Sequence, residues 1–231
     1  MKPILIFLLL FCIDTSKAQQ TFQKSGASYS DSVSSVHIEP FDMDELALPI
    51  ALVYSGVAVN GNHSGSLKHH LMEDRNKYLP TFRNYVDDYL QFAPIMAAYG
   101  LDVLGYTSRT DLGNRTLILI KGEMAMFGIT QLLKRTIRQR RPDGSNFHSF
   151  PSGHTAQAFA AATFLCEEYQ HRFSWMPYIA YGAASGVGAM RIANNKHFIS
   201  DVLVGAAIGI LSMKASYWTH RYLFGTKRIK K

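Results

Sequence analysis

Apolar residues recur along most of the chain in long segments with helical spacing. The helices that this pattern predicts span approximately residues 46–59, 89–106, 114–133, 155–170, 176–190 and 198–218. Ala, Leu and Met dominate several of these segments, and no series of alternating strands separated by Gly-rich turns occurs. The pattern therefore predicts an all-α fold, a helical bundle with about six core helices.

Two pairs of glycines indicate where helices could pack closely. Gly182 and Gly186 are four residues apart in one segment, and Gly205 and Gly209 in another. Residues four apart share a helical face, and without side chains they let a second backbone approach. Such spacing also arises by chance in helices rich in Gly and Ala, so the pairs alone do not establish a contact.

The N-terminal region differs in composition from the rest. Lys2 precedes a short apolar run, and Ser16 and Ala18 supply the small residues that a signal peptidase requires. We expect residues 1–18 to be a cleaved signal peptide, which predicts an exported, periplasmic protein. Residues 19–45, rich in Ser, Gln and Asp, read as a flexible leader.

Charge is distributed unevenly around a net value of +7. Ten basic and thirteen acidic residues precede Lys134, whereas residues 202–231 contain six basic residues and no acidic one. Nucleic acid is the common partner of a basic protein, but an export signal and apolar helices argue against it. A phosphate site, together with a basic tail over residues 226–231 at an anionic membrane surface, explains the charge better.

The sequence leaves open whether the helices cross a membrane. The segment 198–213 is apolar enough, although Asp201 lies near its start, and Lys121, Glu123 and Asp102 interrupt other segments. Charges facing lipid cost about 2.5–3.5 kcal/mol each. These residues should therefore face the bundle interior, unless the bundle is largely water-soluble. We expect membrane association, either embedded or peripheral, or a soluble periplasmic protein.

A first candidate cluster for phosphate chemistry is Lys134 followed by Arg141-Pro142. Two cations at a helix end can converge on one phosphate, with Arg as a bidentate fork and Lys as a point charge. Pro142 is expected to stop the helix and turn Arg141 out of its register. A basic helix end before proline is more often a solvated terminus.

A second cluster is Pro151-Ser152-Gly153-His154, directly before an apolar helical segment. Ser152 at a helix start and Gly153, which permits close backbone approach, describe an anion site made from amide N–H groups. His154 at its rim would donate a proton to a leaving oxygen. An ordinary N-cap with an incidental histidine is the alternative.

A third cluster contains Arg191, His197 and Asp201. The four-residue spacing predicts that Asp201 lies one helical turn from His197, where its carboxylate can accept a ring N–H and leave the other nitrogen as a nucleophile. Arg191 would add a third cation for phosphoryl oxygens. A capping aspartate beside a helix-start histidine is the alternative, which weakens once all three clusters occur in this order.

The three clusters together resemble the PAP2 superfamily of type 2 phosphatidic acid phosphatases and vanadium haloperoxidases. The family pattern is K-x6-RP, then PSGH, then SR-x5-H-x3-D, and the resemblance covers approximately residues 90–218 within an expected domain of 46–225. Met190 departs from the pattern, because the family usually has serine there. This puts the fine positioning of Arg191 in doubt more than the activity.

The resemblance implies a phosphatase with a phosphohistidine formed on His197, oriented by Asp201, and with His154 as acid and base. The groups implied to bind the phosphoryl oxygens are Lys134, Arg141, Ser152, Gly153 and Arg191. No metal or cofactor is implied. The expected substrate is a lipid phosphate such as phosphatidate, polyprenyl diphosphate or lipid A. The alternatives are a soluble acid phosphatase for small phosphomonoesters, a haloperoxidase, and an inactive lipid-binding protein.

Overall fold

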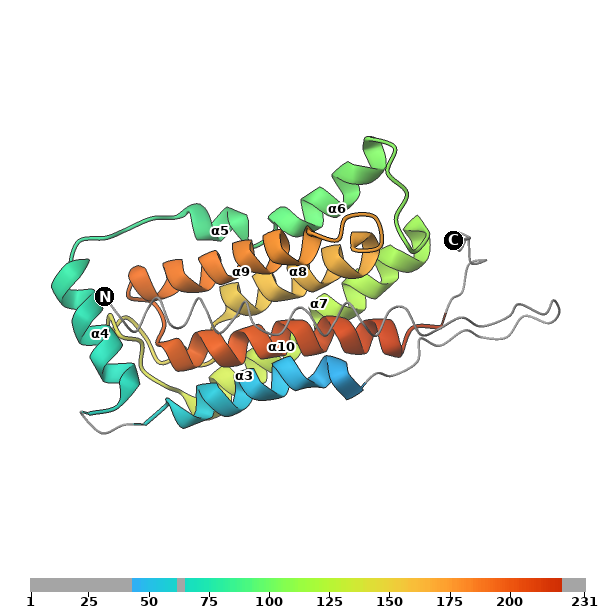
Figure 1. Cartoon of the computed structure of the whole chain (residues 1–231). Coiled ribbons are helices and arrows are strands. Elements are labelled where there is room, and N and C mark those ends of the chain that lie inside the picture. The colour runs from blue at the N-terminus through green and yellow to red at the C-terminus, as the bar shows by residue number, and fades with distance from the viewer. Residues whose placement is uncertain (1–42, 62–64, 222–231) are drawn as a thin grey trace, which may run out of the picture. The chain divides into compact units, whose positions relative to one another are not determined.

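The computed structural model describes residues 43–61 and 65–221, and in these ranges the regular elements are all helices (Figure 1). The predicted all-α class is therefore confirmed. The elements are η1 (Met43–Leu46), α3 (Ala47–Ala58), α4 (Leu67–Tyr78), α5 (Val86–Leu90), α6 (Ala93–Val103), α7 (Leu112–Ile137), α8 (Gly153–Tyr169), α9 (Met176–Ala193) and α10 (Ile199–Trp218).

Helix α8 is the centre of the bundle, because it packs against α10, α9, α6 and α7 (Figure 1). Every residue of α8 from Thr155 to Tyr169 is buried. Many of these side chains are alanines, whose small size lets the surrounding helices approach on all sides. A helix that is buried all round is held by its neighbours rather than by one apolar stripe.

The two glycine pairs have different outcomes. A Cβ on Gly205 would lie 2.6 Å from the carbonyl oxygen of Ser152, and one on Gly209 would overlap the carbonyl oxygen of Ala156. The expected close packing is thus confirmed between α10 and α8. For Gly182 and Gly186 the expectation is wrong, because a Cβ on either residue would have no atom of another helix within 4 Å.

Buried charges in the apolar segments are paired inside the bundle. Arg115 of α7 is fully buried and forms an ion pair with Asp102 of α6, which also accepts a hydrogen bond from Tyr169. Near this end of α8, Glu168 accepts a hydrogen bond of 2.7 Å from Tyr217 of α10. These contacts provide the partners that charged groups need when they leave water.

The predicted segments agree with the structure except in three places. The segment 89–106 is divided into α5 and α6 by a break at Gln91–Phe92. The helix predicted over 114–133 continues to Ile137. Helix α4 was missed, because it is polar along most of its length and lacks the apolar periodicity on which the prediction depends.

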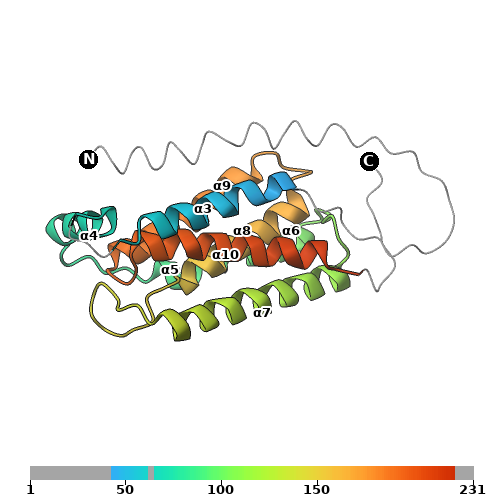
Figure 2. The ribbon, with the colours of Figure 1, turned by 90° about the horizontal axis from the view of Figure 1, so that it is seen from below.

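Helices α7 and α10 are both long and apolar enough to cross a membrane. Most of the apolar part of α10 is buried in the bundle, whereas α7 is largely exposed along the outer side of the bundle (Figure 2). Its exposed apolar side chains include Ile120, Met124, Phe127 and Leu132. This is the arrangement expected if α7 contacts lipid or a partner.

Several predicted segments lie outside the described residues. They are the signal peptide at 1–18, the leader up to residue 42, and the basic tail at 226–231. The last three leader residues, 43–45, belong to η1.

Candidate active site

The predicted site residues meet at one end of the bundle, where α7 and α9 end and α8 and α10 begin. Direct contacts connect the clusters: the Ser152 amide donates to the Asp201 carbonyl at 2.9 Å, and the Lys134 ammonium donates to the Pro151 carbonyl at 2.6 Å. The positions brought together are Lys134, Arg141, Ser152, Gly153, His154, Arg191, His197 and Asp201.

His197 is buried, with 2% of its surface exposed, and its Nδ1 lies 3.4 Å from Oδ2 of Asp201. The predicted pairing is therefore present, but its helical basis was wrong. His197 lies before α10, and Asp201 is in the first turn of that helix, where its carboxylate accepts the Phe198 amide at 3.0 Å. Asp201 thus orients His197 from a capping position rather than from one turn along a helical face.

The pKa of His197 is lowered to about 4, mainly by burial and to a smaller extent by the cations Lys134 and Arg141, although Asp201 opposes the shift. At neutral pH the imidazole is consequently uncharged and keeps a lone pair. A neutral imidazole is the form that can act as a nucleophile.

Two residues missed in the sequence complete the surroundings of Asp201. Gln139 donates to Oδ1 at 3.0 Å, and the Ser149 hydroxyl donates to Oδ2. Both belong to the segment that connects α7 to α8. Ser149 is only two residues before Pro151, so proximity to the PSGH cluster was the one signal that could have indicated it.

Helix α8 begins at the PSGH cluster, as both readings of this cluster predict. Ser152 is the N-cap, and its hydroxyl accepts hydrogen bonds from the amide and hydroxyl of Thr155. Gly153 begins the helix, and a Cβ placed on it would lie 3.9 Å from the Lys134 side chain. The positive end of the α8 dipole therefore lies beside an ammonium group, which favours an anion between them.

Two neighbouring guanidinium groups of the site have unpaired donors. The Nε atoms of Arg141 and Arg191 are buried and have no hydrogen-bond partner. A buried donor without a partner is costly, and a phosphoryl oxygen would satisfy it. The predicted helix stop at Pro142 was wrong: α7 ends at Ile137, where Arg138 adopts a left-handed conformation with φ of 48°.

A pair of adjacent carboxylates on α5 was also missed. Asp87 is buried and accepts a hydrogen bond of 2.7 Å from Arg191. Asp88 lies 2.8 Å from Nε2 of His154. The predicted helix over 89–106 began one residue after this pair, so the prediction left both carboxylates outside any element.

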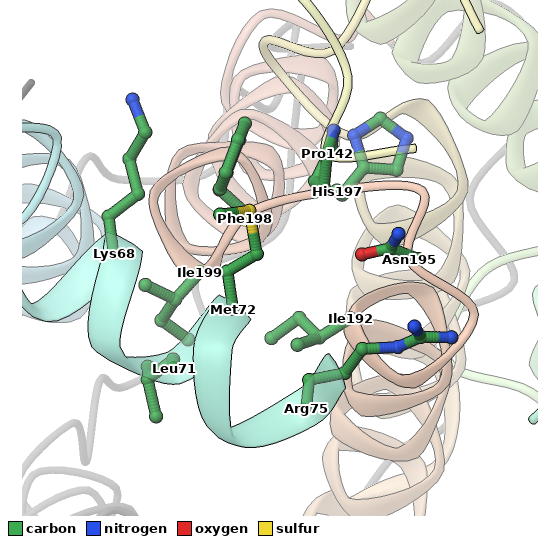
Figure 3. A pocket seen from close by; sticks show the side chains of 10 residues that line it. All are labelled: Lys68, Leu71, Met72, Arg75, Pro142, Ile192, Asn195, His197, Phe198 and Ile199. Atoms are coloured by element: carbon green, nitrogen blue, oxygen red, sulfur yellow. The ribbon is translucent and has the colours of Figure 1, made fainter. Parts of the chain in front are cut away.

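Two hollows adjoin the site. A cavity of about 230 Å³ is lined by Arg83, Tyr85, Asp88, Arg191, Asn194 and Lys196. A smaller pocket of about 10 Å³ lies where α4 covers His197, with Leu71 and Met72 on its wall (Figure 3). Arg75 connects α4 to the end of α9, because its Nε donates a hydrogen bond to the Ala193 carbonyl.

The arrangement combines an uncharged, buried imidazole, a carboxylate that orients it, three neighbouring cations and a second histidine. Among residues 43–61 and 65–221, no three His, Cys, Asp or Glu side chains are grouped as a metal site. Lys134, Arg141 and Arg191 are cations placed where they can neutralise an anion.

The model of the PAP2 superfamily matches residues 50–224. The chain belongs to the PAP2 superfamily. The PAP2 match contains all eight predicted site positions, including the motif residues on α8 and before α10. It also contains α4 and most of α5, which precede the motif-bearing region at approximately residues 90–218.

One PAP2 relative is a lipid A 1-phosphatase from Porphyromonas gingivalis. It is 39% identical over 145 residues, which are 62% of this chain and 33% of the relative. The chain thus spans about a third of the length of that relative.

Two solved structures match part of the chain. LpxE from Aquifex aeolicus is 24% identical with a TM-score of 0.47, covering 63% of this chain and 93% of LpxE. A transmembrane PAP2-type phosphatidylglycerolphosphate phosphatase from Bacillus subtilis is 21% identical with a TM-score of 0.45, covering 74% of this chain and 93% of the other.

Proposed function

We propose that this PAP2 protein is an exported phosphatase that hydrolyses lipid phosphates through a phosphohistidine formed on His197. The observation that carries the proposal is the pair of unpaired, buried Nε donors of Arg141, which is near the His197 ring, and of Arg191, which is near Arg141. Preformed donors around a nucleophile are what phosphoryl transfer requires, because its transition state is stabilised mainly by positioning and electrostatics.

In the first step, the free ring nitrogen of His197 attacks phosphorus, and the bond from phosphorus to the leaving oxygen breaks. His154 gives its proton to that oxygen. Arg141, Arg191 and Lys134 hold the non-bridging oxygens throughout. The leaving alcohol then departs with the proton, and the phosphoryl group remains on His197.

In the second step, a water molecule attacks phosphorus and gives a proton to His154. The bond between phosphorus and the His197 nitrogen breaks, and inorganic phosphate leaves. Asp201 accepts the N–H of His197 in both steps and keeps the ring in one orientation. His154 ends protonated, as it began.

A lipid substrate is supported by the exposed apolar side of α7 and by the PAP2 relative that is a lipid A 1-phosphatase. The signal-like N-terminal sequence supports action in the periplasm or at the outer face of the inner membrane. The substrate classes to compare are phosphatidate, polyprenyl diphosphate, lipid A and small phosphomonoesters.

The first prediction concerns the nucleophile. His197→Ala should lower phosphate release by at least about 10³-fold, because no other group can carry the phosphoryl intermediate. Release is measured on purified protein with each substrate class. His70→Ala is the matched control, because His70 is an exposed histidine of α4.

The intermediate gives an independent readout. Wild-type protein mixed with ³²P-labelled substrate should retain an acid-labile, base-stable label, which His197→Ala should lack. Activity within a few-fold of wild type in His197→Ala would contradict the mechanism. Comparison of lipid phosphorylation in cells with and without the gene would then identify the substrate class.

A further inference from the structure

The contact between Asp88 and His154 joins two elements that are distant in the sequence. Oδ1 of Asp88 on α5 lies 2.8 Å from Nε2 of His154 at the start of α8. The His154 side chain is 31% exposed and that of Asp88 is 44% exposed. Both groups are thus accessible from solvent, and neither is needed to fill the core.

Helix α5 is held in place by the neighbouring carboxylate. Asp87 is buried against Arg191, and Asn194 exchanges two hydrogen bonds with Asn84, just before α5. The position of Asp88 is therefore fixed by contacts other than its own with His154. A carboxylate that is placed independently can orient its partner.

Asp88 also faces one of the two hollows that adjoin the site. It lines the cavity of about 230 Å³ beside Arg191, and its Oδ1 lies 3.6 Å from Nη1 of that residue. His197, the nucleophile, does not line this cavity. In an in-line displacement the leaving group departs opposite the nucleophile, and we take this cavity, which Asp88 lines together with Arg191, as the space for that group.

We infer that Asp88 is a positioning residue, which holds His154 with Nε2–H toward its carboxylate and leaves Nδ1 to deliver a proton to the leaving oxygen. The inference rests on the proposed phosphatase function and adds a residue to its site. A carboxylate that accepts a ring N–H favours the protonated imidazole and fixes its orientation. His154 must be in that form for the first step.

The charged surroundings show why such a partner is needed. The pKa of His154 is lowered on balance: burial and Arg191 lower it, whereas Asp88 and, to a smaller extent, Asp87 raise it. Without Asp88 the proton would be lost at lower pH. The charged groups that face His154 or its end of α8 are Asp87, Asp88, Lys134, Arg191 and Asp201.

The first test measures the pKa of His154 directly. The ring of His154 is followed by NMR during a pH titration of the full-length protein and of the Asp88→Asn variant, with His154→Gln used for assignment. The pKa of His154 should be lower in Asp88→Asn. Asp74→Asn, which removes the same charge from an exposed position on α4, should leave it unchanged. An unchanged His154 pKa in Asp88→Asn would overturn the inference.

The second test uses the leaving group. With an alkyl phosphate, whose alkoxide leaves poorly without a proton, kcat/KM of Asp88→Asn should fall roughly tenfold, which is part of the roughly 10²–10⁴-fold that acid catalysis supplies. The basic limb of its pH profile should move to lower pH. With p-nitrophenyl phosphate, whose leaving group needs no proton, the loss should be less than about twofold. Equal losses with both substrates would indicate a merely structural role.

A double substitution separates this inference from the proposed function. In a His154→Gln background, Asp88→Asn should have no further effect on alkyl phosphate turnover, because the group on which it acts is absent. If wild-type protein releases phosphate while Asp88→Asn behaves as wild type in both tests, the inference alone is overturned. If wild-type protein releases none from any substrate, the proposed function is overturned as well.

Discussion

His197 shows how one buried side chain connects chemistry with stability. Its pKa is lowered to about 4 in the folded protein, mainly by burial, whereas the pKa of a histidine in an unfolded chain is about 6.5. At neutral pH the ring is uncharged in both states. Between these two pKa values the unfolded chain binds a proton that the folded chain does not, so the free energy of unfolding decreases as the pH falls.

The titration of His197 should therefore make the stability of the protein depend on pH. Between pH 7 and pH 4.5 the titration of His197 should remove about 2–3 kcal/mol of stability, equivalent to a decrease in Tm of roughly 5–10 °C. His197→Asn cannot titrate, so its Tm should decrease correspondingly less over the same interval. The measurement is thermal unfolding of purified protein at both pH values. Parallel decreases in the two proteins would show that His197 does not cause the effect.

Among the elements, the contact between α10 and α8 depends on glycines, because Gly205 and Gly209 let the two backbones approach closely. We predict that Gly209→Ala lowers the free energy of unfolding by about 1–3 kcal/mol, because its methyl group would overlap the backbone of Ala156. Gly182→Ala is the control: it is a helical glycine with open space around it, and alanine is the better helix former. Its stability should be unchanged or slightly higher, as measured by denaturant unfolding. A similar loss in both variants would mean that helix propensity, not packing, decides the outcome.

The elements that could be predicted from the sequence share one property, which is an apolar face or run long enough to show a period. Helix α10, predicted over 198–218 and observed over Ile199–Trp218, is the clearest case. Helix α4 could not be found in this way, because it contacts the bundle through a few residues such as Arg75, and most of its surface is polar. Tertiary contacts stabilise it, and these are not visible in local periodicity.

The same distinction applies to the site. Residues such as His197 and Asp201 were found because their spacing is local and matches a family pattern. Asp88 is 66 positions from its partner His154, and Gln139 is 62 positions from its partner Asp201. Their partners become apparent only once α5 and the segment after α7 are placed against the start of α8 and α10. The helix stop at Pro142 failed for a local reason, because the left-handed Arg138 ends α7 first.

For the whole molecule, the exposed side of α7 raises the question of what surrounds the bundle. Met124, Phe127 and Leu132 are each at least 63% exposed. A row of large apolar side chains in water is unfavourable, whereas in lipid it costs nothing. This indicates a helix whose apolar side faces a bilayer or a partner.

Spin labels can test this arrangement. In a protein without Cys12 and Cys166, a nitroxide at Phe127→Cys in liposomes should be relaxed by oxygen, which concentrates in lipid. A nitroxide at Asp74→Cys on α4 should be relaxed by a water-soluble nickel complex. The measurement is power-saturation EPR on both labelled proteins. Relaxation by nickel at position 127 would exclude contact of this side of α7 with lipid.

The burial of α8 from Thr155 to Tyr169 also limits how the protein can change during evolution. A larger side chain in this range has to be accommodated by the surrounding helices, which also position the N-terminal turn with Ser152 and His154. Fewer residues of α4 and α5 are buried, although α4 lines the small pocket at His197 and α5 lines the cavity beside Arg191. Descendants of this protein can therefore acquire new substrates through α4 and α5, while inheriting the reaction itself unchanged.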